Sequence, residues 1–180
     1  AYWCWPSKRR NTRRNMAVVA CAQAAQARPG AQAVRPYDAG ALARASWRNY
    51  GRYIIDFFNL PSLPVEEVVR RVTVHGWEHL DRALDLGRGV IFVSGHLGTY
   101  DYAPLVLAHR YPDSVHAVAE PFSSAKIDDL IQGHRMAKGA TMIPMTSVRK
   151  MVRVLRENHI LAVLVDRPVH GDGVPVEFFG

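Results

Sequence analysis

Apolar residues recur every three or four positions between residues 41 and 58, which is the rhythm of one face of an α-helix. The positions on this face are Ala43, Trp47, Tyr50, Ile54 and Phe57. Asp38 precedes the segment and is suited to capping a helix start. The pattern therefore predicts an amphipathic helix over residues 41–58.

Arginines form a second stripe on the same predicted helix. Arg44, Arg48 and Arg52 follow one another at four-residue steps, apart from the apolar positions. Aromatic residues on one face and arginines on another are typical of a helix that lies in a lipid interface. A helix packed on a protein core with a solvated basic edge has the same pattern, and the helix taken alone favours this second interpretation.

From residue 65 onward, short apolar runs rich in β-branched residues alternate with segments of helical periodicity. The strand candidates are residues 72–75, 90–94, 115–119, 141–144 and 160–165. The helix candidates are residues 77–86, 99–110, 123–138 and 147–157. Such alternation predicts the α/β class, with a mainly parallel central sheet flanked by helices.

The charge is distributed unevenly and supports a division of the chain at residue 64. Residues 1–64 hold 10 Lys and Arg against 2 Asp and Glu, whereas residues 65–180 hold 13 against 14. The basic first part predicts a helical N-terminal segment that faces a membrane or a nucleic acid. The nearly neutral remainder argues against a nucleic-acid groove across the α/β domain.

His96 is the first candidate for chemistry, because a buried strand candidate runs into a glycine-flanked turn that presents it. Asp101 follows in the stretch His96-Leu-Gly-Thr-Tyr-Asp101. A carboxylate bonded to one imidazole nitrogen leaves the other nitrogen free to accept a proton. An isolated His-x4-Asp spacing is also compatible with an ordinary turn histidine, and that alternative stays open on spacing alone.

Charged residues also follow two other strand candidates. Glu120 comes after residues 115–119, and Asp166-Arg167 comes after residues 160–165. Ligands of parallel sheets bind beyond the carboxyl ends of the strands, so these residues and His96 converge on one rim. Arg135 or Arg167 could pair with a carboxylate or hold a phosphate, although internal salt bridges fit equally well. The histidines show no metal-ligand spacing, so we expect no metal site.

The motifs in order resemble those of the bacterial lipid A biosynthesis acyltransferase family. The resemblance rests on residues 46–53, 74–80, 87–101, 117–122, 135–139, 165–167 and 173–180. This family includes lauroyl and myristoyl acyltransferases and the phosphatidylinositol mannoside acyltransferases. Val118-Ala-Glu120 and Asp166-Arg167 look closer to the mannoside branch, although that branch tends to carry Glu where Asp166 stands.

The resemblance implies a glycerolipid-acyltransferase-like fold and transfer of a fatty acyl group from a thioester to a hydroxyl of a membrane glycolipid, a phosphatidylinositol mannoside. It makes His96 the catalytic base and Asp101 the residue that orients it. Glu120, Arg135, Asp166 and Arg167 would line the acceptor site. The donor would be acyl-CoA or an acyl carrier protein, with no further cofactor.

The family also implies a place at the inner membrane. We expect peripheral attachment at its cytoplasmic face, with Arg44, Arg48 and Arg52 against anionic lipids and no nucleic-acid partner. The chain opens on Ala1 and stops at Gly180, so we also expect a fragment whose α/β domain, from residue 65 to 180, is truncated at its C-terminal end.

Three alternatives remain from the sequence. The acceptor could be a lipid A precursor, as in the lauroyl and myristoyl enzymes. The chain could instead be a basic binder of lipid or nucleic acid without catalysis, which would not depend on His96. A third alternative is a hydrolase of the same family, in which water replaces the acceptor.

Overall fold

The computed structural model describes residues 4–25, 38–120, 124–136, 139–167 and 175–177. The chain divides into two compact units, and the division falls between Ile55 and Asp56, earlier than the predicted boundary at residue 64. The first unit contains α1 (Pro6–Ala25) and most of α2 (Ala39–Asn59). The second unit runs from Asp56 to His170 and contains the sheet.

The first unit holds two long helices. α1 begins at Pro6, before the Ala-rich stretch, because proline suits the first turn of a helix. α2 confirms the amphipathic helix predicted over residues 41–58. Its Ala43 is fully buried, and the Trp47 indole N–H donates a hydrogen bond to the Thr12 hydroxyl of α1 at 3.1 Å. Part of the predicted apolar face therefore packs against protein.

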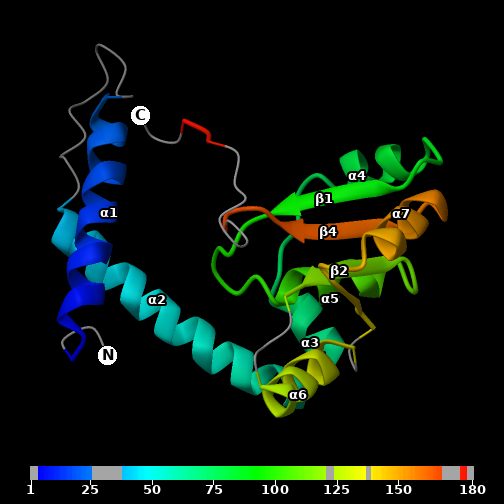
Figure 1. Cartoon of the computed structure of the whole chain (residues 1–180), viewed down its shortest axis with the longest axis horizontal. Helices are drawn as coiled ribbons and strands as arrows, with labels where there is room; N and C mark the ends of the chain where they lie inside the picture. Colours follow the sequence, from blue (N-terminus) through cyan, green and yellow to red (C-terminus); the bar gives the residue numbers. More distant parts are fainter. Residues whose placement is uncertain (1–3, 26–37, 121–123, 137–138, 168–174, 178–180) are drawn as a thin grey trace. The chain divides into compact units, whose positions relative to one another are not determined.

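The second unit holds a parallel four-stranded sheet in the order β1-β4-β2-β3 (Figure 1). The strands are β1 (Val90–Ser94), β2 (Val115–Ala119), β3 (Thr141–Pro144) and β4 (Ile160–Leu164). The remaining elements are η1 (Leu60–Ser62), α3 (Val65–Arg70), α4 (Trp77–Leu84), α5 (Tyr102–Arg110), α6 (Ala125–Met136) and α7 (Val148–Arg156). The predicted α/β class with a parallel sheet is confirmed.

Residues 72–75, which the sequence predicts to be a strand, are irregular in the structure. The prediction was wrong because this run is short and lies between two helices. The Val72 amide bonds back to the Val69 carbonyl of α3, and Gly76, at a φ of 87°, begins α4. Val72 packs against the core around Leu60 and Tyr102 instead of pairing with a strand.

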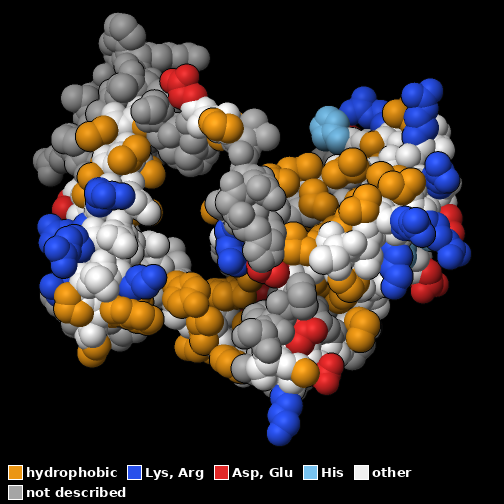
Figure 2. Space-filling model, viewed as in Figure 1, with side chains coloured by type: hydrophobic (Ala, Val, Ile, Leu, Met, Phe, Trp, Pro, Cys, Tyr) orange, Lys and Arg blue, Asp and Glu red, His pale blue; other side chains and the backbone are white. Residues whose placement is uncertain are grey.

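Helices cover both faces of the sheet, because side chains alternate along each strand. On one face, Val115 and Ile160 pack with Leu107 and Ala108 of α5 and with side chains of α4. On the other face, Leu161 and Ile143 pack against Val154 of α7. β1 lies at the edge of the described sheet, and Ile91 and Val93 on its second face are 56% and 59% exposed. Figure 2 shows hydrophobic side chains gathered on the surface over this part of the sheet.

Asn158 holds β1 beside β4 at the amino ends of the strands. Its side-chain oxygen accepts a hydrogen bond from the Gly89 amide at 2.9 Å, and its side-chain nitrogen donates to the Leu84 carbonyl at 3.1 Å. Gly89 has a φ of 70°, and a side chain there would lie 2.5 Å from the Leu155 carbonyl oxygen. The close approach of these segments therefore requires glycine at position 89.

At the same end of the sheet, two histidines stack on one another. The rings of His116 on β2 and His159 are 5.3 Å apart and nearly parallel, and their facing nitrogens are 3.1 Å apart. The Nδ1 atom of His116 is buried with no hydrogen-bond partner. Burial lowers the pKa of His116, and His159 lowers it further, against an opposing effect of Glu157, which pairs with Arg153.

The stacked pair of His116 and His159 makes the free energy of unfolding depend on pH. Because the folded chain disfavours protonated His116, the unfolded chain binds more protons below the ordinary pKa of about 6.5. The contribution of neutral His116 to stability is therefore fully present above that pH and is lost as the pH falls toward the lowered pKa. We expect His116→Gln to flatten the denaturant-measured stability between about pH 7 and pH 5. Exposed His109→Gln is the control. If the free energy of unfolding changed with pH by the same slope in wild type and His116→Gln, this prediction would be contradicted.

Candidate active site

The register of β1 and β4 brings together two of the predicted site residues. Ser94 at the end of β1 pairs with Leu164 at the end of β4, and the Val165 amide continues the ladder to the Ser94 carbonyl. His96 and Asp166 each lie two residues beyond this last pair. Because the strands are parallel, both side chains emerge at the same edge of the sheet.

Two hydrogen bonds join His96 to Asp166. The Nδ1 atom of His96 lies 2.7 Å from Asp166 Oδ1, and the His96 backbone amide donates to Asp166 Oδ2 at 2.8 Å. The side chains are 29% and 41% exposed, so the pair stands at the mouth of the site. A carboxylate that accepts from both the ring and the backbone of one residue keeps the same ring nitrogen turned toward it.

The pairing also determines which imidazole nitrogen is available. A carboxylate only accepts hydrogen bonds, so in the neutral ring the proton lies on Nδ1 and Nε2 is left as an acceptor. Partial burial raises the pKa of the Asp166 carboxyl, but the hydrogen bonds from His96 outweigh it and leave the pKa below its ordinary value. Asp166 is therefore ionised at neutral pH, as the arrangement requires.

Gly95 allows Asp166 to approach this closely. A side chain at position 95 would lie 3.3 Å from Asp166 Oδ2, a distance at which the carboxylate must move. The glycine next to the histidine therefore makes room for the aspartate of the adjacent strand. The sequence indicates only that Gly95 permits a turn and does not reveal this contact.

Asp101, predicted to orient His96, lies at the start of α5 and is 2% exposed. The carboxylate bonded to Nδ1 of His96 is Asp166, to which the sequence assigns a place in the acceptor site. The spacing argument could not find Asp166, because it considers only residues near His96 in the chain. The orienting role of Asp101 stays a prediction.

Arg167 and Glu120 also meet at this edge. The Arg167 guanidinium lies 3.8 Å from Glu120 Oε2, and both side chains are more than half exposed. β2 lies directly beside β4, so the residues that follow the two strands are neighbours. Arg135 belongs to α6, and its side chain lies outside the described residues. The substrate-binding roles of these three residues stay predictions.

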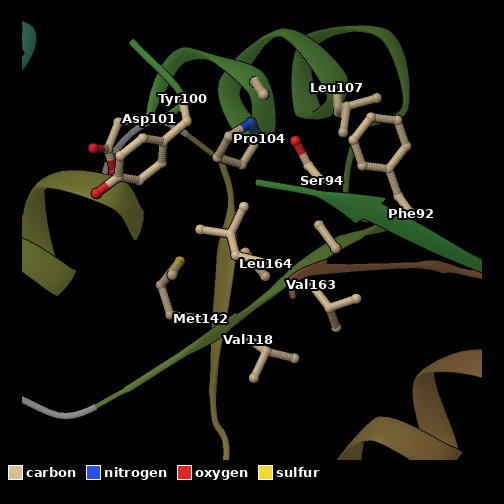
Figure 3. A pocket seen from close by; sticks show the side chains of 13 residues that line it. Phe92, Ser94, Tyr100, Asp101, Pro104, Leu107, Val118, Met142, Val163 and Leu164 are labelled. Carbon is tan, nitrogen blue, oxygen red and sulfur yellow. The ribbon is translucent and has the colours of Figure 1, made fainter. Parts of the chain in front are cut away.

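An apolar cavity of about 70 Å³ lies between α5 and the sheet, directly behind the loop that carries His96 (Figure 3). Its walls come from all four strands and from the start of α5. Hydrophobic side chains dominate the lining, among them Phe92, Leu107, Val118, Met142 and Leu164. Tyr100 and Asp101 close the end nearest the loop. Such a lining suits a hydrocarbon chain.

A larger, open groove of about 610 Å³ shares part of its lining with this cavity. The groove mixes polar and charged side chains, including Arg71, Thr73 and Asp56, with apolar ones. The Thr99 hydroxyl donates to Asp56 Oδ2 at 3.1 Å, which ties the loop to the end of α2. Tyr102 also lines the groove, and its hydroxyl is buried without a hydrogen-bond partner.

Two further features concern the described part of the chain alone. Among these residues, no group of three or more His, Cys, Asp or Glu side chains could hold a metal ion. No described helix is both long enough and apolar enough to cross a bilayer.

Comparison with protein families decides the classification. The family model of the bacterial lipid A biosynthesis acyltransferases matches residues 6–180. The chain belongs to this family. The match includes the strand ends that carry His96, Glu120 and Asp166, so the edge described above lies within the matched region.

Curated relatives come from the mannoside branch. A phosphatidylinositol mannoside acyltransferase of Mycobacterium tuberculosis is 28% identical over 146 residues, which are 77% of this chain and 46% of that protein. The enzyme of the same name from Mycolicibacterium smegmatis is 28% identical over 144 residues, 77% of this chain and 47% of that protein. The chain thus spans about half the length of the curated relatives it matches.

The link between His96 and Asp166 can be tested without any assay of activity. Because the ring of His96 lowers the pKa of the Asp166 carboxyl, we expect His96→Ala to raise that pKa toward the ordinary value. Carboxyl carbon chemical shifts followed by NMR during a pH titration would measure it. Asp81, whose pKa is lowered by the hydroxyl of Tyr111, serves as the internal control and should not change. An unaltered Asp166 titration would show that the pair does not form.

Proposed function

We propose that the protein transfers a fatty acyl group from a thioester donor to a hydroxyl of a membrane glycolipid, with a phosphatidylinositol mannoside as the acceptor. The observation that carries the proposal is the His96–Asp166 pair, which stands open at the strand ends beside an apolar cavity. Membership of the acyltransferase family supports the reaction, and the mycobacterial relatives favour the mannoside acceptor over a lipid A precursor.

In the proposed reaction, His96 acts as general base. Its Nε2 takes the proton of the acceptor hydroxyl while the hydroxyl oxygen attacks the thioester carbonyl. The carbon–sulfur bond then breaks, the new ester forms, and the thiolate takes the proton back from His96. The Asp166 carboxylate stabilises the imidazolium between these two steps. Direct attack by the acceptor needs no covalent intermediate on the protein and no cofactor.

The surroundings of the pair suggest how the substrates divide the site. The cavity behind Tyr100 and Asp101 is apolar and would take the end of the acyl chain. The exposed Glu120–Arg167 pair, with Arg135 on α6, offers carboxylate and guanidinium groups to the hydroxyls and phosphate of the acceptor. Acyl-CoA and an acyl carrier protein both present the thioester that this arrangement requires.

We also propose that α2 holds the protein on the cytoplasmic face of the inner membrane. Arg44, Arg48 and Arg52 are exposed along one stripe, and Tyr50 and Ile55 of the same helix are 58% and 62% exposed. Cations beside exposed apolar side chains suit an anionic lipid surface, which is where the acceptor lies.

Substitutions of the pair in the full-length protein test the chemistry. We expect His96→Ala and Asp166→Asn each to lower acyl transfer by about 10²-fold or more while the protein stays folded. Labelled acyl-CoA, a panel of mannolipid and lysolipid acceptors, and mass spectrometry of the lipid products provide the measurement. Circular dichroism checks the fold of each variant.

Asp101→Asn is the matched comparison for Asp166→Asn. If Asp101→Asn abolished transfer in a folded protein while Asp166→Asn did not, Asp166 would not be the orienting carboxylate. Free fatty acid without acylated lipid would support the hydrolase alternative. Full function in His96→Ala would support the non-enzymatic binder.

Liposome co-sedimentation tests the membrane surface. We expect replacement of Arg44, Arg48 and Arg52 by Gln to weaken binding to anionic vesicles, by about 1 kcal/mol for each cation near the surface. A triple variant of the exposed cations Arg149, Lys150 and Arg156 on α7 removes the same charge and is the control. If the two triple variants lost vesicle binding equally, net charge alone would explain the effect and α2 would not be the binding surface.

A further inference from the structure

The His96 ring is held from two directions. On one side, Asp166 accepts the hydrogen bond of Nδ1 at 2.7 Å. On the other, the ring of Tyr100 packs edge to face, with ring centroids 4.8 Å apart and the planes at 76°. This separation and angle are those of a favourable aromatic pair. A hydrogen bond to one nitrogen alone leaves the ring able to swing about that contact, and the second ring limits this motion.

A short glycine turn brings Tyr100 back toward His96. The Leu97 amide bonds to the Gly95 carbonyl at 2.8 Å, and Gly98 follows with a φ of 59°. This conformation favours glycine. The next backbone bond, from Tyr102 to the Thr99 carbonyl, starts the helical turn that fixes Tyr100. Leu97, in the same loop, is 81% exposed and does not confine the histidine ring.

Tyr100 also lines both hollows of the site, the apolar cavity and the open groove. The side chain is half-buried, and Figure 3 shows it beside Asp101 at the end of the cavity. The same side chain therefore contacts the proposed base and borders both hollows.

We infer that Tyr100 is a positioning residue, whose aromatic ring holds the His96 imidazole with Nε2 directed at the reacting hydroxyl. The inference rests on the proposed acyl transfer for its effect on rate, but the ring contact is independent of that function. It is the ring that acts, so Phe should replace Tyr100 and an aliphatic side chain should not.

Three variants of the full-length protein, Tyr100→Phe, Tyr100→Leu and Tyr100→Met, test the inference. We expect Leu and Met to lower kcat about tenfold or more with KM within about twofold, because a misplaced base affects the chemical step more than binding. Tyr100→Phe should retain kcat within about twofold of the wild type. Thermal unfolding identifies any variant that has lost its fold. Two aliphatic variants are used so that the test still holds if one of them does not fold.

NMR of the His96 ring supplies a readout that does not depend on turnover. The ring protons of His96, assigned with His96→Gln, should be shifted by the neighbouring aromatic ring in wild type and Tyr100→Phe. The shift should be lost in Tyr100→Leu and Tyr100→Met. A wild-type protein that transfers no acyl group would refute the proposed function, and the ring shifts would still decide the position of His96.

Two results would overturn the inference. In the first, folded Tyr100→Leu and Tyr100→Met keep the wild-type kcat and leave the ring protons of His96 unshifted relative to wild type. In the second, Tyr100→Phe loses as much kcat as Tyr100→Leu, which would assign the effect to the hydroxyl and not to the ring.

Discussion

The parallel pairing of β1 with β4 is the interaction on which the site depends. It is fixed at the amino ends by Asn158, which bonds to Gly89, and it continues to Ser94 and Leu164 at the carboxyl ends. His96 and Asp166 then follow their strands by the same number of residues. A shift of this register by one residue would turn the side chains of one strand to the opposite face and would separate the pair.

The loop after β1 adds what the register alone does not supply. Gly95 leaves room for the Asp166 carboxylate, and Gly98 turns the chain so that Tyr100 returns to the histidine ring. Tyr100 of this loop lines both the apolar cavity and the open groove. A base beside an apolar cavity is suited to act on a donor that carries a hydrocarbon chain, as the proposed reaction requires.

Most of the second unit could be predicted because its signals are local. β1, β2, β3 and β4 form where the apolar runs occur, and α7 lies within the helix predicted over residues 147–157. The run at 72–75 shows the limit of such signals: an apolar stretch becomes a strand only if a partner strand is available, and Val72 finds a helical core instead. The convergence of His96, Glu120 and Asp166 on one edge followed from the parallel direction of the strands alone.

The sequence by itself determined the fold class, the family and the place of His96 just beyond a strand, because periodicity, turn residues and motif order are all properties of neighbouring positions. Only the tertiary structure decided that Asp166 reaches His96. Asp101 is five positions away along the chain, whereas Asp166 is 70 positions away and lies on the adjacent strand. Contacts across a parallel sheet depend on strand order and register, and neither is written in the spacing of a motif.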